Sequence, residues 1–576
     1  MSTNNIYPPA GVEGAVLANS EINEKISSPK AKINERCLNT HTPISRLPPE
    51  LLSYIFKFYM DSNPVEKPVD WEDYFDASSS AYWYAYRFLI AQVSHHWRQV
   101  ALQTPCLWAE IVMTSLECFK EMLVRSKEAP LAIICHILCD GWEMREIMGL
   151  LVSELHRIQE LVLTAPKHFL QTINRECNLP RNATQLRMLH VADCDEPYRT
   201  FVRPIPFIST WSLPQLQELE IEGYALSSFQ MLLPPSLTSL NWFPSTSHTV
   251  GHLLDLLQRT PQLRTLVIND PLCKLESETL DIHVKLSHLQ HLRVDCRLAA
   301  CTALVNYLEF PKDIEVHLHG GGAELSPDEE IAGLQALSTV VCKSFTPNFL
   351  RSFDISPFED HEDDEFLGII FRGWSTVLPH ELPGLGNPDP KPHLQLTFSD
   401  FEPIEKLVGI VCSQLPLSNV DYLRVNHSDH YVIRAWRDAF YRMVNLTKLQ
   451  VWGNSADVLP QALHITDVPM ASTDGVSGER MKLFPRLAFL RLQEVHFVEP
   501  AGLPPTEGDF ISRLKRALKD RCAHGYVLVH LDIWPMLSST HEHILKEVVK
   551  KMTYEGAGEG RVSYAREDAE AIVGDT

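Results

Sequence analysis

Histidine and cysteine side chains at close spacing are the residues of this sequence that come nearest to a metal site. Two histidines bind zinc from one face of a helix when they stand four residues apart. His541 and His543 stand two apart, so their imidazoles would not share a helical face. Cys135, His136 and Cys139 could approach a metal ion, but they lie in an apolar run without a second pair of ligands. We interpret them as buried structural residues and expect no metal ion.

The other candidate groups give no better evidence of catalysis. Gly320-Gly-Gly322 lacks the Lys-Ser/Thr of a phosphate-binding loop and predicts a turn. Six of the seven residues from Glu359 to Glu365 are acidic, which is typical of a solvated loop. No Ser/His/Asp or Cys/His group stands out. We therefore expect no catalytic residue, no cofactor and no enzyme activity; an enzyme would need a catalytic group within residues 310–415.

Composition restricts the classes of partner. The 576 residues include 51 Lys and Arg against 73 Asp and Glu, which gives a net charge of −22. Such a charge argues against binding to nucleic acid or to an anionic membrane. The apolar run from Ala129 to Cys139 is too short to cross a bilayer, and the first 26 residues lack the apolar stretch of a secretory signal. With 13 cysteines and no CxxC pair, we expect reduced thiols and a cytoplasmic or nuclear location.

A short pattern, apolar-x-x-apolar-x-apolar, recurs along the chain. The first six copies start 28, 30, 21, 26 and 26 residues apart. Periods of ~20–29 residues are typical of leucine-rich arrays, in which each unit is a strand followed by a return segment. The copies start at Ile158, Leu186, Leu216, Leu237, Leu263 and Leu289, and further ones start at Val420, Leu446, Leu487 and Leu528.

This repeat predicts an α/β fold. A single unit cannot bury its apolar side chains, but stacked units form a parallel sheet on the inner, concave face and one continuous core. The Asn of the ideal pattern is missing from most copies, so we expect an irregular leucine-rich-repeat solenoid. Between about 310 and 415 the pattern blurs, and we interpret that region as degenerate repeats with surface insertions. Ile314–Leu318 and His393–Phe398 nevertheless alternate like strands.

Two helical stretches precede the repeats. Pro48 and Pro49 suit the start of a helix whose apolar residues recur at helical spacing up to Tyr59. A second helical stretch is predicted from about Tyr82 to Leu102, and Thr104-Pro105 ends it.

These helices carry a motif. Leu47-Pro-Pro-Glu-Leu-Leu-Ser-Tyr-Ile-Phe56, Ala91-Gln-Val-Ser-His-His-Trp-Arg-Gln-Val-Ala101 and Leu107-Trp108 resemble the F-box of fungal F-box-like proteins. The likeness covers roughly residues 43–112, and the loop from Met60 to Ala81 is longer than is usual in that module. With the repeats behind it, the whole chain resembles an F-box/leucine-rich-repeat protein.

The resemblance implies partners. In that family the F-box binds a Skp-type adaptor, which bridges to a cullin scaffold, and the repeats hold the substrate of the ubiquitin ligase. A helical module of this size would also leave apolar side chains that need a partner. By their positions in the motif, the predicted adaptor-binding residues are Leu47, Pro48, Leu51, Ile55, Val93, Trp97 and Trp108.

The surface for the target protein follows from strand geometry. Residues that alternate with the core positions of a strand face the other side of the sheet. Among these, acidic, aromatic and arginine side chains are our candidates, because aromatic residues and Arg dominate binding energy at interfaces. The predicted substrate-binding residues are Glu218, Glu220, Tyr422, Arg424, Trp452 and Arg491.

Two functions are therefore expected from the sequence. The first is an F-box substrate receptor that links a target protein to a Skp-cullin-type ubiquitin ligase. The second is a repeat scaffold that binds the adaptor, or another partner, without promoting ubiquitin transfer. The predicted domains are a disordered arm (1–42), the F-box-like module (43–112), the repeat domain (113–535) and a C-terminal helix with a flexible tail (536–576).

Overall fold

The computed structural model divides the chain into two compact units. The first comprises Met1–Thr164 and Arg181–Leu186, and the second comprises Ala165–Pro180 and Arg187–Thr576. The structure describes residues 43–62, 88–137, 141–166, 168–170, 181–193, 211–224, 233–244, 248–270, 273, 282–321, 326–359, 366–379, 389–399, 401, 404–426, 433–464, 483–495, 509–536, 539–556 and 560–565. The predicted arm (1–42) and most of the acidic run lie outside these residues.

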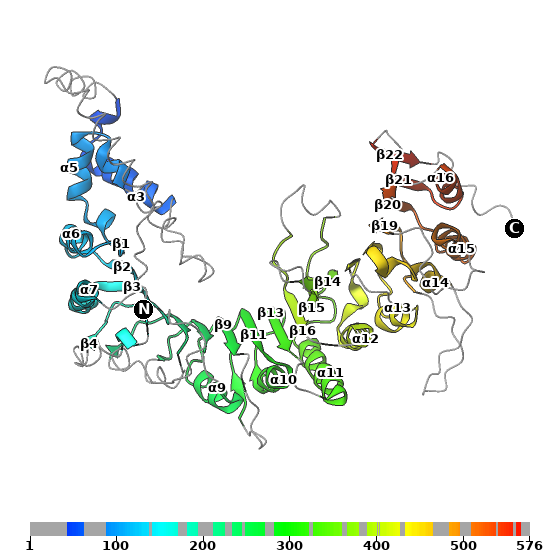
Figure 1. Ribbon diagram of the computed structural model, residues 1–576, viewed down its shortest axis with the longest axis horizontal. Coiled ribbons are helices and arrows are strands. Elements are labelled where there is room, and N and C mark those ends of the chain that lie inside the picture. Colours follow the sequence, from blue (N-terminus) through cyan, green and yellow to red (C-terminus); the bar gives the residue numbers. More distant parts are fainter. Residues whose placement is uncertain are drawn as a thin grey trace, which may run out of the picture. The chain divides into compact units, whose positions relative to one another are not determined.

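The first unit joins a helical segment to a small parallel sheet (Figure 1). Strand β1 pairs with β2, and β2 pairs with β3, both in parallel. Because β1 belongs to the predicted F-box-like module and β2 follows it, the module and the first strands form one compact unit. The elements are η1 (Pro43–Arg46), α3 (Pro49–Ser62), η3 (Phe88–Gln92), α5 (His95–Gln103), η4 (Pro105–Trp108), β1 (Glu110–Val112), α6 (Leu116–Ser126), β2 (Leu131–His136), α7 (Trp142–Ser153), η5 (Leu155–Arg157), β3 (Ile158–Thr164) and β4 (Arg181–Asn182).

The second predicted helix is divided in the structure. Ser94 is in an extended conformation, with a φ of −158°, and its hydroxyl accepts a hydrogen bond from the backbone N–H of Trp97 at 3.1 Å. This N-cap starts α5, because a Ser side chain satisfies an N–H group that the first turn leaves without a partner. The segment before the cap is the short helix η3. Helix α5 ends at Gln103, in agreement with the prediction of a break at Thr104-Pro105.

The second unit is built on a large, mostly parallel sheet, which confirms the predicted α/β class. The strands of this sheet up to its centre are β5 (Met188–Ala192), β7 (Glu218–Glu222), β8 (Ser239–Phe243), β9 (Thr265–Asp270), β11 (His291–Arg297) and β13 (Glu315–Gly321). The short strands β6 (Trp211–Ser212), β10 (Val284–Lys285) and β12 (Leu308–Glu309) lie outside it, and β10 pairs with β12 in parallel. Neighbours β5, β7, β8, β9, β11 and β13 pair in this order, all in parallel.

The repeated leucines share one register in this sheet. Leu189 pairs with Leu219, Leu219 with Leu240, Leu240 with Leu266, and Leu266 with Leu292. Each is at most 2% exposed. The spacing of the triplets therefore corresponds to the step from one strand to the next, and the leucines form one buried row.

The centre of the sheet differs from the prediction. Strands β14 (Ser352–Glu359) and β15 (Phe366–Trp374) form an antiparallel pair, β15 is also antiparallel to β16 (Leu394–Ser399), and β16 is parallel to β13. Strand β14 then pairs in parallel with β17 (Tyr422–Asn426). The region predicted to carry surface insertions thus contributes buried strands to the sheet, with Ile355 and Phe371 both 0% exposed.

The remaining strands continue beyond β17 as β18 (Lys448–Trp452), β19 (Phe489–Gln493), β20 (His530–Met536) and β21 (Lys551–Gly556), all in parallel. Strand β22 (Gly560–Ala565) pairs with β21 in antiparallel fashion. These last two strands lie in the segment predicted to be a C-terminal helix with a flexible tail (536–576). Its Gly and Glu content conceals the alternation of Met552 and Tyr554, which are 0% and 4% exposed.

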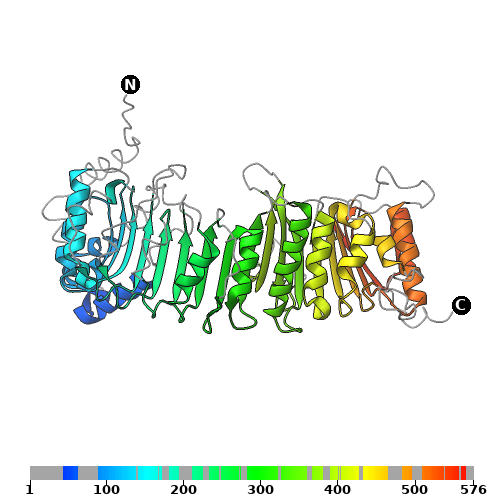
Figure 2. The same cartoon turned by 90° about the horizontal axis from the view of Figure 1, so that it is seen from below.

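Helices cover the leucine face of the sheet. They are α9 (Val250–Leu257), α10 (Leu298–Tyr307), α11 (Pro327–Lys343), α12 (Ile404–Gln414), η9 (Leu417–Asn419), α13 (Ile433–Phe440), η10 (Gly453–Ala456), α14 (Leu459–Leu463), α15 (Phe510–Ala523) and α16 (Ser539–Lys546). Each of α9 to α13 contacts the next, and Figure 2 shows these helices side by side on the strands of this unit. Among the described helices, none has the length and apolar character to cross a membrane.

Glycines of β13 and β15 are needed where backbones approach closely. Gly320 belongs to strand β13 rather than to the predicted turn. A Cβ on Gly320 would lie 3.2 Å from Leu298 Cδ1 at the start of α10, which is a tight contact. Gly368 has a φ of +156°, and a Cβ on it would lie 2.0 Å from the carbonyl oxygen of Phe398 on β16. The antiparallel pairing of β15 with β16 therefore requires glycine at position 368.

Candidate functional site

Helix α3 of the first unit is apolar on two sides. Its inner side carries Leu52 and Phe56, which are 0% and 1% exposed. The ring of Phe56 packs against that of Trp97 on α5, with 5.0 Å between centroids. These contacts join the two helices of the module and explain why Leu52 and Phe56 are the buried residues of α3.

The opposite side of α3 exposes apolar side chains. Leu51, Tyr54, Ile55, Phe58 and Tyr59 are 52%, 76%, 43%, 73% and 38% exposed, and we call them the outer apolar surface of α3. A helix that is apolar all round is normally covered on all sides. This surface therefore has the character of an interface.

The structure places most of the predicted adaptor-binding residues at the surface. Leu51, Ile55 and Val93 are exposed, and Pro48 is exposed just before α3. Leu47 is half-buried. The sequence prediction missed Tyr54 and Phe58, which are the most exposed members of the outer apolar surface of α3. Their spacing of four residues was the available signal.

The two predicted tryptophans lie deeper in the module. Trp97 is half-buried against Phe56. Trp108 is only 4% exposed; its Nε1 donates to the carbonyl oxygen of Ala101 at 2.8 Å, and the guanidinium of Arg125 lies 4.5 Å from its ring centroid. Trp108 therefore lies in the core of the unit rather than at its surface, and its role at the adaptor interface stays a prediction.

In the second unit, the sheet face opposite the buried leucines carries a row that is polar except for Val267; we call it the polar row. Its members stand on successive strands at the same register level, so each side chain lies beside those of the neighbouring strands. The row, in spatial order, is His190, Glu220, Asn241, Val267, Arg293, His317, Gln395, Arg372, Asp354, Arg424, Gln450, Arg491, Asp532 and Thr553.

The part of this face on β7 is acidic and partly accessible. Glu218 is exposed, whereas Glu220 and Glu222 are half-buried. Burial, together with the negative charges of Glu220 and Asp193, raises the pKa of Glu222 above its ordinary value. Asn241 Nδ2 donates to Glu220 Oε2 at 3.3 Å. The predicted residues Glu218 and Glu220 thus stand on an open, negatively charged stretch of the sheet.

Histidines of the same face are paired with carboxylates. His291 Nδ1 lies 2.9 Å from Glu315 Oε2, and His319 Nδ1 lies 3.1 Å from Asp295 Oδ2. Burial lowers the pKa of the neighbouring His317. These are pairs rather than a coordination sphere: in the described ranges, no group of His, Cys, Asp and Glu is arranged to hold a metal ion.

The histidine and cysteine residues considered as metal ligands from the sequence have structural contacts or are buried. His541 Nε2 lies 3.1 Å from Asp509 Oδ2. Cys135 is fully buried, and burial raises the pKa of its thiol to about 12, as expected for a structural thiol. Cys139 lies outside the described residues.

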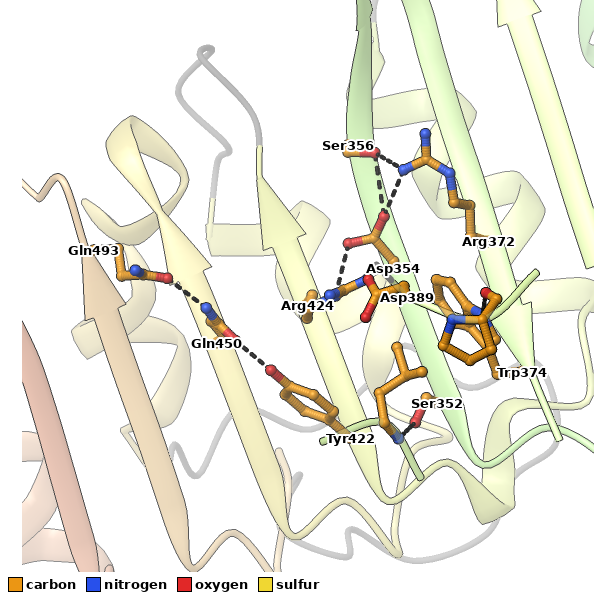
Figure 3. Close-up of polar contacts among 12 residues, drawn as sticks. Ser352, Asp354, Ser356, Arg372, Trp374, Asp389, Tyr422, Arg424, Gln450 and Gln493 are labelled. Carbon is orange, nitrogen blue, oxygen red and sulfur yellow. Dashed lines mark hydrogen bonds and ion pairs between the residues drawn. The ribbon is translucent and has the colours of Figure 1, made fainter. Parts of the chain in front are cut away.

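An ion-pair cluster occupies the centre of the polar row (Figure 3). Asp354 of β14, 4% exposed, lies between two guanidiniums: its Oδ1 is 3.2 Å from Arg424 Nε, and its Oδ2 is 3.0 Å from Arg372 Nη1. The same Arg372 Nη1 donates to Ser356 Oγ at 2.8 Å. Arg424 Nη2 is 2.7 Å from Asp389 Oδ2. Burial lowers the pKa of Arg424, but the two carboxylates outweigh burial and leave that pKa raised.

A hydrogen-bonded chain of side chains continues from β17 to β19. Tyr422 donates its hydroxyl to Gln450 Oε1, and Gln450 Nε2 donates to Gln493 Oε1, as Figure 3 shows. Tyr422 is 2% exposed, and burial raises the pKa of its hydroxyl to about 12. The chain therefore holds a neutral phenol within the sheet face.

The predicted substrate-binding residues divide into two groups. Glu218 and Glu220 are accessible, and Trp452 is half-buried on β18. Tyr422, Arg424 and Arg491 are predicted at the surface but are buried. The reason is that each finds a partner on a neighbouring strand; Arg491 Nε, for example, donates to Asp532 Oδ2 at 2.7 Å. Their contact with a target protein remains a prediction.

Comparison with known proteins adds no family. No protein-family model matches the chain. No curated protein matches it either. Function is therefore inferred from the chain's own side chains.

Proposed function

We propose that this chain is an F-box substrate receptor, in which the N-terminal module binds a Skp-type adaptor and the second unit binds a target protein. The adaptor links the receptor to a cullin scaffold and a ubiquitin-conjugating enzyme. The receptor itself does no chemistry; it raises the effective concentration of the target beside the conjugating enzyme. The outer apolar surface of α3, together with the F-box-like motif that contains it, carries the proposal.

The proposed roles of the two sides of α3 are distinct. Leu52 and Phe56 hold the module together, because they are buried. The exposed side offers large apolar side chains such as Tyr54 and Phe58, and burial of such side chains against a partner stabilises a complex by ~1.5–3 kcal/mol for a full side chain. This division supports an adaptor interface that can be changed without unfolding the module.

We also propose that the second unit is a leucine-rich-repeat solenoid. In-register leucines on successive parallel strands, with a helix or irregular segment between them, support this assignment. The antiparallel strand β15 is an interruption of the repeat. In this arrangement the polar face of the sheet is the inner face, where repeat proteins offer an extended binding surface.

A capture experiment tests the adaptor interface. The full chain is co-expressed with a Skp-type adaptor, and three forms are compared: wild type, the double variant Leu51→Glu/Ile55→Glu, and Val124→Glu. Val124 is 71% exposed on α6 of the same unit, so it controls for the effect of an added charge at an exposed apolar position. We expect the wild type and Val124→Glu to retain the adaptor and the double variant to lose it, with unchanged circular dichroism.

Two results bear on the alternatives. If the wild-type chain does not retain the adaptor, the proposal is wrong. If the adaptor is retained but no cullin joins it, and the half-life of captured proteins is the same with the double variant, the chain is a scaffold rather than a ligase receptor.

A further inference from the structure

The strands at the centre of the polar face leave one positive charge unbalanced. Arg372 of β15 and Arg424 of β17 both pair with Asp354 of β14. The strands thus contribute two guanidiniums and one carboxylate to this cluster of described residues. The side chain of Arg372 is 32% exposed, but those of Arg424 and Asp354 are only 9% and 6% exposed, so water screens the charge of Arg424 only weakly. A buried charge of this kind needs a further anion.

That anion is supplied by a segment that is not part of the sheet. Asp389 precedes β16, and its Oδ2 lies 2.7 Å from Arg424 Nη2. Pro390 and Pro392 follow Asp389 in the chain, separated by one residue. Side chains of the sheet contact the carbonyl groups of both prolines. Trp374 Nε1 donates to the Pro390 oxygen at 2.7 Å, and His317 Nε2 lies 3.0 Å from the Pro392 oxygen. We call Asp389–Pro392 the strap.

The two sides of this contact are built differently. On the sheet, Arg424, Trp374 and His317 come from three strands, and Arg424 also lies 5.4 Å from the Trp374 ring centroid. On the strap, the side chain of Asp389 is 36% exposed. The contacts with the strap thus use one carboxylate and two carbonyl groups, which any extended segment with acidic and proline residues can offer.

We propose that Arg424, Trp374 and His317 form a binding site for an extended Asp-Pro-x-Pro segment, and that the chain's own strap occupies this site. A target segment of the same chemistry enters by exchange with the strap. The carboxylate pairs with Arg424, and the carbonyl groups after it accept hydrogen bonds from the indole and imidazole N–H groups. This inference deepens the proposed function, because it names the chemistry of the target. The role of the site in holding a target rests on the proposed function, whereas the binding of such a segment at the site does not.

The test uses the full chain alone, without adaptor, so that its failure is separate from failure of the adaptor proposal. The probe is a fluorescein-labelled peptide with the sequence of residues 387–393, Asn-Pro-Asp-Pro-Lys-Pro-His, and binding is measured by fluorescence anisotropy. In the wild type the peptide competes with a tethered strap whose effective concentration is ~mM. In the variant Asp389→Asn the strap loses its charge, and we expect the peptide to bind at least about tenfold more tightly.

Two further variants, made on the Asp389→Asn background, locate the site. Arg424→Gln is expected to weaken peptide binding at least about tenfold, because the carboxylate loses its main partner. Arg351→Gln is the matched control: Arg351 forms an ion pair with Asp421 at the start of the same strands, but outside the site. It should leave binding unchanged. A peptide with Asn in place of Asp should bind weakly to every form.

The proposal is overturned if the Asp389→Asn chain binds the peptide no better than the wild type, or if Arg424→Gln has the same effect as the control. If Asp389→Asn does not fold, a crosslinking experiment on the wild-type chain tests the exchange instead. A peptide with a photo-crosslinking group in place of its Lys, added at a concentration comparable to that of the tether, should crosslink to strands β13, β14, β15 or β17. Crosslinks only elsewhere, or none, contradict exchange at this site.

Discussion

Replacing Arg491 by Gln should loosen strands β19 and β20. Arg491 and Asp532 face each other across these strands, their side chains are 7% and 2% exposed, and 2.7 Å separates Nε from Oδ2. Thr553 of β21 also donates its hydroxyl to Asp532. Removal of one partner from a buried ion pair costs ~3–5 kcal/mol, because the other charge stays buried without its ion-pair partner.

This cost can be measured locally by amide hydrogen exchange. A tenfold change in an equilibrium corresponds to ~1.4 kcal/mol, so amides that exchange through opening of this region should exchange roughly 100- to 3,000-fold faster in Arg491→Gln. The amides to follow are those of Leu490, Leu492 and Leu531. Asp532→Asn should have a similar effect. The double variant should lose little more than either single variant, since its second change removes a charge that has already lost its ion-pair partner.

Two outcomes would refute this reasoning. One is exchange in Arg491→Gln within about threefold of the wild type, which would mean that the ion pair adds nothing to the folded state. The other is additivity of the two single changes. The exposed Glu218→Gln serves as the control and should leave the exchange of β19 and β20 unaffected.

Three further predictions concern other parts of the second unit. Gly368→Ala should lower the thermal midpoint and weaken exchange protection in β15 and β16, because its Cβ would meet a carbonyl oxygen at 2.0 Å. Glu222→Gln should raise the denaturation midpoint at pH 7. The raised pKa of Glu222 means that the folded state binds the proton more tightly than the unfolded state does, so the charged carboxylate destabilises the folded state at pH 7. This destabilisation disappears as the pH falls through the folded-state pKa towards the ordinary value of 4.5. Arg521→Met should lower stability by ~2–5 kcal/mol in urea denaturation, since the buried guanidinium donates to two backbone carbonyl oxygens, each at 2.7 Å.

Each of these has a control and a contrary result. Gly409→Ala on helix α12 meets nothing within 4 Å and should be neutral or stabilising; equal effects at both glycines would contradict the steric argument. Glu218→Gln controls for the loss of a charge at an exposed position of the same strand. A gain in stability of Glu222→Gln that grows as the pH falls would contradict the expected sign. Arg516→Met, on the same helix as Arg521, should be near wild type; similar losses at both arginines would show a general effect of lost charge.

The regular strands of the second unit were predictable from the sequence. Leu219, Leu240 and Leu266 recur at the step of a strand and its return, and burial of one apolar side is enough to define their register. Strands β14 and β15 escaped because their buried residues, such as Phe353 and Phe371, follow simple alternation without the leucine pattern. The pairing of β15 with β16 against the direction of the other strands has no signal in local periodicity.

The candidate sites show the same limit. Alternation along a strand placed Glu218 and Arg424 on the same face, which is correct. It could not show that Arg424 is buried, because burial depends on Asp354 and Asp389, which are 70 and 35 residues away in the chain. The apolar residues of α3 were visible from the sequence, but which of them face inward depends on the contact between Phe56 and Trp97.

The antiparallel pair at the centre of the second unit affects how the chain can fold. Parallel neighbours such as β11 and β13 meet only after an intervening helix has been ordered, whereas β14 and β15 follow each other directly in the chain. Closure of a short loop costs less entropy than closure of a long one. Folding of this unit can therefore nucleate at a local hairpin in its middle, with parallel strands then added on both sides.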